Sequence, residues 1–282
     1  MAGFFGLFNY EKEGPGISKN APKKKTFIVF FETFFRNFWK FIPINLVYAL
    51  LSLPVLTSGL ACAGLTNVTR NIARDKHSFG VSDFFDTVKK NWKQALAAGI
   101  INTVVYVVLF FDLYFFYFSA KGVMASVGTG ITLCLLFIFT VMNYFIWTLI
   151  ITFKFSLKQV YKNSFKFVFI NMKLNLLCFF SVLLVYGVNV GLLFLLQAYF
   201  LPVLTFEILL YILLFPSFRF LFVQYCVFPS VKKYIIDPYY LEHPDEDIEK
   251  RRDLGIEIEE KKKPETENGE NSEEEPENVF ED

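Results

Sequence analysis

Two long stretches almost without charge constrain most strongly how this chain can fold. Ile100–Phe118 contains one charged residue and Gly128–Phe153 contains none. An apolar stretch of about 18 or more residues is long enough to cross a hydrocarbon core of about 30 Å. Lipid offers no water to unpaired backbone groups, and these continuous runs lack the alternation of barrel strands. The sequence therefore predicts an all-α integral membrane protein.

Charged residues are concentrated at the two ends of the chain and in two interior segments. The tail from Asp237 holds 19 of the 27 acidic residues but only 6 of the 28 basic ones. It is rich in Glu and Pro and poor in aromatic residues, so it is expected to be disordered. We therefore expect a cytoplasmic N-terminal arm over residues 1–25, a helical transmembrane domain over 26–236 and an acidic cytoplasmic tail over 237–282.

About six transmembrane helices, arranged as hairpins, are expected in the apolar part. One long span over Phe41–Val68 would leave the following Arg and Lys residues outside, against the positive-inside rule. A turn near Pro54 would return them to the cytoplasm, although residues 54–68 are short for a full crossing. Thr26–Lys40 is predicted to be an amphipathic entry helix, either on the membrane interface or at the start of the first span. The alternative is that this helix packs on other protein.

Two cytoplasmic amphipathic helices are expected between the hairpins. The first is Ser82–Lys90, with Ser82 as its N-cap, and the second is Ser156–Phe169, with lysines spaced four apart. The basic residues of the loops are gathered on one side of the predicted topology, whereas Lys121 alone lies on the other side. This asymmetry predicts that both termini are cytoplasmic. The candidate docking residues on this face are Asp83, Phe84, Phe85, Lys90, Trp92, Lys158, Lys162 and Lys166.

The motifs of catalysis and of cofactor binding are missing from the sequence. The two histidines, His77 and His243, lie in polar segments, and the four cysteines are far apart without metal-ligand spacing. No metalloprotease, nucleophile-elbow or phosphate-loop motif occurs. We therefore expect no enzyme activity, no metal, no cofactor and no binding of nucleic acid.

Ionisable residues inside predicted spans are the remaining candidates for a functional site, because a charge in lipid is costly. Asp112, Glu207 and Arg219 form this candidate intramembrane polar site. The two acids could receive a cation or a sugar hydroxyl, or could simply lie at the headgroup level. Arg219 is expected to pair with an acid or to extend toward the inner surface. The amides expected to bond across helices are those of Asn102, Asn143, Asn189 and Gln197.

Two segments carry a resemblance to a known family. The first is Ser52-Leu53-Pro54-Val55-Leu56-Thr57 with the small residues after it, and the second runs from Ser82-Asp83-Phe84-Phe85 to Lys90-Asn91-Trp92-Lys93. In these motifs the chain resembles the YesL-like family of bacterial membrane proteins, a domain of unknown function numbered 624. The resemblance extends over roughly Thr26–Ile235. It implies a plasma-membrane protein, mostly of Gram-positive bacteria, that accompanies carbohydrate uptake.

Three functions remain open at this point. The favoured one is an accessory component that binds the permease or the ATPase of an ABC-type carbohydrate transporter; the warrant for carbohydrate is the resemblance alone. The second is a permease in its own right, although the importer motif that engages an ATPase is missing. The third is a non-transporting membrane scaffold or sensor.

Overall fold

The computed structural model describes residues 26–195 and 200–242, and every regular element in these ranges is a helix. The chain divides into two compact units, residues 1–232 and 233–282. The N-terminal arm and most of the acidic tail, for which the sequence makes predictions, lie outside the described residues. The elements are α1 (Thr26–Arg36), α2 (Phe38–Ser52), η1 (Val55–Thr57), α3 (Ser58–Ala73), α4 (Val81–Tyr114), η2 (Phe115–Ser119), α5 (Gly122–Thr152), α6 (Leu157–Ile170), α7 (Met172–Leu195), α8 (Phe200–Leu213), α9 (Phe215–Val231), η4 (Lys232–Ile236) and α10 (Asp237–Glu242).

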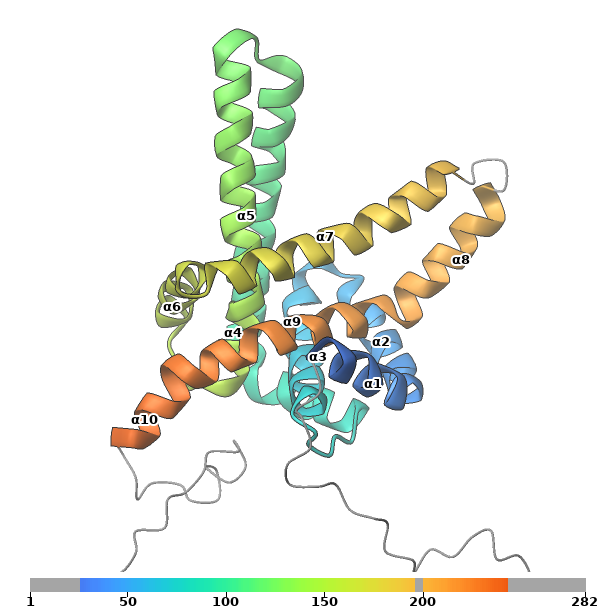
Figure 1. Cartoon of the computed structure of the whole chain (residues 1–282), viewed down its shortest axis with the longest axis vertical. Coiled ribbons are helices and arrows are strands. Elements are labelled where there is room, and N and C mark those ends of the chain that lie inside the picture. The colour runs from blue at the N-terminus through green and yellow to red at the C-terminus, as the bar shows by residue number, and fades with distance from the viewer. Residues whose placement is uncertain (1–25, 196–199, 243–282) are drawn as a thin grey trace, which may run out of the picture. The chain divides into compact units, whose positions relative to one another are not determined.

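The hairpin of α4 and α5 is the longest element of the first unit (Figure 1). Its outer half exposes apolar side chains such as Val107, Phe111 and Val127. A contiguous apolar surface of this size is not stable in water but suits contact with lipid chains. By length and composition, Val81–Ser119 and Gly122–Thr152 could each cross a membrane.

Two further spans are available only if bent helix pairs are counted as one span each. Leu157–Ile170 and Met172–Val188 meet at 95°, and Leu204–Leu210 meets the helix that starts at Phe215 at 48°. The described residues thus provide two to four candidate spans. The membrane character predicted from the sequence is confirmed, whereas six spans stay a prediction.

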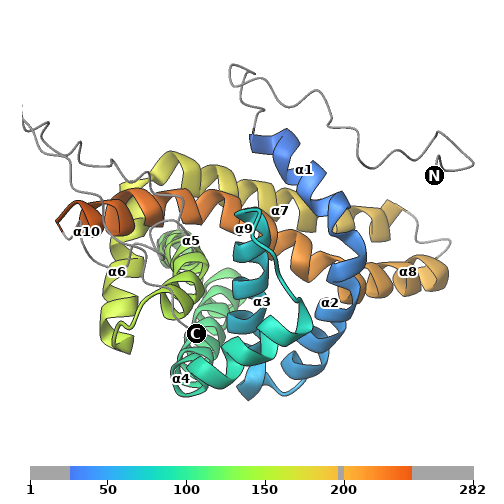
Figure 2. The ribbon, with the colours of Figure 1, turned by 90° about the horizontal axis from the view of Figure 1, so that it is seen from below.

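The predicted turn near Pro54 is confirmed, because α2 and α3 form a hairpin around η1. α3 lies against the inner half of α4 through small residues, and a Cβ atom added to Gly99 would lie 2.7 Å from the Cα atom of Gly59. Likewise, a Cβ atom at Gly64 would lie 2.8 Å from the ring of Phe84. These close approaches, one to the backbone of α4 and one to a ring on it, place α3 in the core of the unit (Figure 2).

The entry helix α1 packs on protein, which is the alternative that the sequence left open. The Phe30 ring lies 5.1 Å from the ring of Phe218 and 5.4 Å from that of Phe222, both on α9. Phe27 and Phe35, on the other side of α1, are exposed. One face of α1 therefore joins the core cluster, and the other remains free for lipid or for a partner.

The first predicted cytoplasmic helix is not a separate element, because Ser82–Lys90 forms the beginning of α4. Ser82 is not the N-cap; Gly80 occupies that position with a φ of 64°, which favours glycine. Asp83 closes the turn instead, by accepting hydrogen bonds from Phe79 N–H at 3.0 Å and from Ser78 Oγ at 2.8 Å. The second predicted helix is α6, where Ser156 and Gln159 form a capping box.

Candidate functional site

A cavity of about 170 Å³ lies in the first unit, where α3, α4, α5 and α9 meet. We call it the Arg219 cavity. Its walls carry hydroxyl, amide and aromatic side chains, and Arg219 is the charged residue among them. The full lining is Ser58, Cys62, Thr66, Gly99, Asn102, Thr103, Tyr106, Asn143, Tyr144, Trp147, Arg219, Phe220, Val223 and Gln224.

Local backbone geometry places these residues. The approach of Gly59 to Gly99 brings α3 close to α4 at the level of the cavity. On the other side, a buried asparagine holds the beginning of α9: Asn45 Oδ1 accepts hydrogen bonds from Ser217 N–H at 3.0 Å and Ser217 Oγ at 2.6 Å. Arg219 lies two residues further along α9, so this anchor determines where its side chain begins.

A chain of hydrogen bonds orients the amides on the cavity wall. The Tyr161 hydroxyl donates to Asn102 Oδ1 at 2.6 Å, and Asn102 Nδ2 donates to Asn143 Oδ1 at 2.9 Å. The expected cross-helix role of Asn102 and Asn143 is thereby confirmed. The side chain of Asn189 and residue Gln197 lie outside the described side chains. Asn143 is only 8% exposed, and its Nδ2 group has no partner among the described residues.

Arg219 has no acidic partner within the part of the chain that the structure describes. Its guanidinium lies 5.6 Å from the centre of the Phe220 ring. The ionisable groups that raise its preference for the charged form include the hydroxyls of Tyr48, Tyr144 and Tyr186 and the thiol of Cys62, and none of these is a carboxylate. The predicted pairing of Arg219 with an acid is therefore not found in the described residues.

The other two members of the predicted intramembrane site lie elsewhere. Asp112 is on the outer half of α4, and Glu207 is on α8; neither lines the Arg219 cavity. The Oε1 atom of Glu207 is buried without a hydrogen-bond partner among the described residues. The three residues are therefore not brought together, and Arg219 is the one that borders a cavity.

The candidate docking residues separate into exposed and buried ones. Phe85 and Trp92 are 41% and 50% exposed, and Lys90 is also exposed. Gln94 Nε2 donates to the Phe155 carbonyl oxygen at 2.7 Å and so ties this part of α4 to the start of α6. Phe84 is fully buried and Asp83 closes the helix turn, so neither offers a free side chain. The exposed lysines of α6 are Lys158, Lys162 and Lys166.

A second arginine, Arg70, joins the ends of α3 and α5, a role that no sequence motif indicated. Its Nη1 donates to Thr152 Oγ1 and its Nη2 to Asn67 Oδ1, both at 2.7 Å. Burial, and to a lesser extent the charge of Arg74, lower the pKa of Arg70 to about 10. Arg70 still carries its charge at neutral pH and acts as a cross-link between helix ends. Among the described residues, no group of three His, Cys, Asp or Glu side chains could hold a metal ion.

Comparison with known proteins gives one family match. Residues 41–113, from α2 to the outer half of α4, match the family described as "Protein of unknown function, DUF624". The resemblance predicted from the motifs around Pro54 and Trp92 is thereby confirmed. No curated protein and no solved structure matches the chain.

Proposed function

We propose that this chain, which carries a DUF624 segment, is a non-enzymatic accessory component of an ABC-type carbohydrate uptake system in the bacterial plasma membrane. The link to carbohydrate comes from the family resemblance. The observation that supports docking is an exposed aromatic residue, Phe85, on the inner end of α4. Phe85 precedes Lys93 by eight residues, or about 12 Å along the helix. It is therefore farther from the apolar half of α4 than the lysines that lie next to that half.

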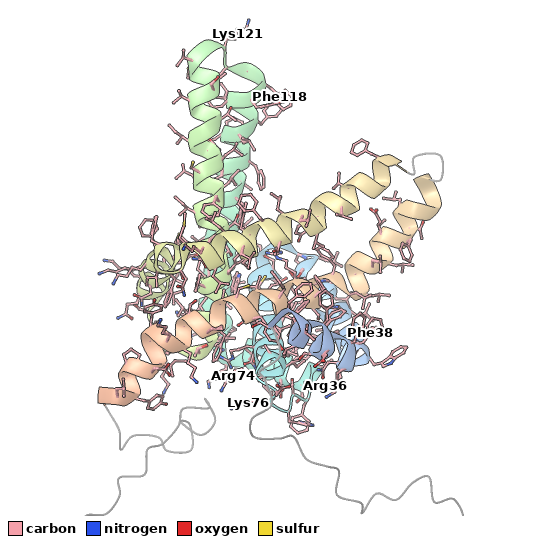
Figure 3. The ribbon with its side chains drawn as sticks, viewed as in Figure 1. Arg36, Phe38, Arg74, Lys76, Phe118 and Lys121 are labelled. Carbon is pink, nitrogen blue, oxygen red and sulfur yellow. The ribbon has the colours of Figure 1, made fainter. Side chains whose placement is uncertain are left out.

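Charge placement supports a cytoplasmic position for this surface. Lys121 lies at the tip of the α4–α5 hairpin, whereas Arg36, Arg74 and Lys76 lie at the opposite end of the first unit (Figure 3). Positive residues are retained on the cytoplasmic side of bacterial membrane proteins. The exposed residues of α4 and α6 would thus face the compartment in which a transporter ATPase works.

Exposed aromatic side chains that have basic residues on the same helix are suited to binding another protein. Buried aromatic anchors contribute most of the free energy in many interfaces, while charged neighbours steer association. We call the set Phe85, Lys90, Trp92, Lys158, Lys162 and Lys166 the inner surface. Its partner would be a permease or an ATPase subunit, and the acidic tail after Tyr240 would be a second contact.

Affinity purification from native membranes tests this proposal. Transporter subunits should co-purify with the tagged full chain and decrease about tenfold or more with Phe85→Ala, as expected for loss of about 1.4 kcal/mol or more of binding free energy. The control is Phe111→Ala, a side chain of the same size that is 67% exposed on the apolar half of α4. A chain truncated after Tyr240 separates the contribution of the tail. Recovery of the protein alone, or equal recovery with both Phe variants, would refute docking by the inner surface.

The second candidate, a permease, is favoured by one observation: the Arg219 cavity lies among the four helices α3, α4, α5 and α9. A permease needs a ligand site that can open to either side of the membrane. Uptake of a labelled sugar or sugar phosphate by liposomes that contain this protein alone would support the permease. Uptake only in the presence of a co-purified transporter would support the accessory component.

A further inference from the structure

The charge balance of the Arg219 cavity indicates which class of ligand it can hold. Arg219 is cationic, and no aspartate or glutamate is among the described residues that line the cavity. A buried charge without a counter-ion is strongly destabilising, and within a membrane protein such a residue often marks a ligand site. The complementary ligand is therefore an anion.

The neutral hydrogen-bond donors around the cavity indicate which kind of anion it can hold. Asn143 Nδ2 is buried without a partner among the described residues, and the hydroxyl of Tyr144 makes no hydrogen bond there either. In this network Asn102 Nδ2 donates to Asn143 Oδ1, so the NH₂ group of Asn143 is the part of that amide left as a donor. Asn143 and Tyr144 both line the cavity.

We propose that the Arg219 cavity binds a phosphate group, with Arg219 as the charged ligand and Asn143 and Tyr144 as neutral donors. The planar guanidinium donates two parallel hydrogen bonds to phosphate oxygens. A tetrahedral phosphate has further oxygens for the amide and the hydroxyl, whereas one guanidinium already occupies both oxygens of a carboxylate. A free sugar or a cation would leave the charge of Arg219 unbalanced.

The size of the cavity agrees with a phosphate that belongs to a larger molecule. A water molecule occupies about 30 Å³ in the liquid, and the cavity of about 170 Å³ is several times larger. The phosphate could come from a membrane lipid headgroup or from a soluble phosphate ester. This inference does not depend on the inner surface or on a transporter partner.

Two measurements on the purified full chain distinguish the two sources. The first is thermal unfolding in detergent with increasing inorganic phosphate at constant ionic strength, with chloride as the reference salt. The second is native mass spectrometry of the protein extracted from phosphatidylglycerol-containing membranes, which reports retained phospholipid. Thermal stabilisation by inorganic phosphate without retained phospholipid identifies a soluble source. Retention of phospholipid identifies a lipid headgroup. In either case the response should depend on Arg219.

Three variants make the result specific. Arg219→Gln should weaken the response about tenfold or more, whereas Lys121→Gln, which removes a cation at the outer turn, should leave it unchanged. Asn143→Asp keeps the acceptor for Asn102 and adds a carboxylate to the cavity wall, so it should fold and lose the response because Arg219 then has an internal counter-ion. No response of the wild-type chain in either measurement, or an undiminished response in Arg219→Gln and Asn143→Asp, would overturn the proposal.

Discussion

At the scale of residues, Asn45 shows how a polar group can hold a helix break inside an apolar core. Pro216 has no N–H group, so the backbone hydrogen bonds between α8 and α9 are interrupted there. Asn45 is fully buried, and its Nδ2 atom donates to the Leu213 carbonyl oxygen at 2.7 Å while its Oδ1 atom accepts from Ser217. One side chain thus satisfies both sides of the break.

Replacement of Asn45 by Ala should destabilise the protein strongly. The change leaves a buried carbonyl, a buried N–H and a hydroxyl without partners, which costs about 3 kcal/mol. Reversible unfolding in mixed micelles would measure the loss. The matched control is Asn163→Ala on α6, whose side chain makes no hydrogen bond among the described residues, and its effect should stay within about 0.5 kcal/mol. Equal effects of the two variants would contradict this role of Asn45.

Part of the candidate site was predictable at this scale. A cation within the last apolar segment marked Arg219, and amides in apolar segments marked Asn102 and Asn143. The sequence could not show that Phe84 points into the core while Phe85 is exposed, because both suit either position. It also could not show that Arg70 links two helix ends, because its partner Thr152 is 82 residues away along the chain.

At the scale of elements, the contact between Gly59 and Gly99 determines how closely α3 approaches α4. Gly99→Ala should lower the unfolding temperature, since its Cβ atom would overlap the backbone of Gly59 at 2.7 Å. The overlap must be relieved by separation of the helices, at a cost of about 1–3 kcal/mol. Thermal unfolding in detergent measures the change.

Gly130→Ala on α5 is the matched control, because no atom lies within 4 Å of its added Cβ. Alanine favours a helix over glycine by about 1 kcal/mol in water, so this variant should be unaffected or slightly more stable. A loss of stability in both variants would mean that helix geometry, rather than the approach of α3 to α4, is responsible.

Elements whose ends are marked by local chemistry were predicted well. Pro54 and the basic residues after it indicated the α2–α3 hairpin, and the lysines spaced four apart indicated α6, whose start is capped by Ser156 and Gln159. The start of α4 was predicted wrongly, because Gly80, with a positive φ, is the N-cap and Asp83 accepts from Phe79 N–H in the turn before the helix. The bend of 95° between α6 and α7 could not be predicted; Asn175 stabilises it by donating to the carbonyl oxygens of Phe167 and Val168.

At the scale of the whole molecule, the proposed orientation predicts two different patterns of chemical labelling. In a chain whose four cysteines are replaced by alanine, a Lys121→Cys variant should react with a membrane-impermeant maleimide on intact cells. A Lys158→Cys variant should react only after the cells are permeabilised, because the basic residues of α6 would face the cytoplasm. The cysteine-free parent is the control. Labelling of Lys158→Cys on intact cells would reverse the proposed topology.

The length of α4 determines how far its inner end extends beyond the lipid. Its 34 residues span about 51 Å, whereas a hydrocarbon core is about 30 Å thick, so about 20 Å of the same helix extends beyond the lipid. Because no loop interrupts the helix, its length determines the height of Phe85 above the membrane surface. Any protein that binds Phe85 must present its own contact at that height, and removal of one helical turn would lower the meeting point by about 5.4 Å.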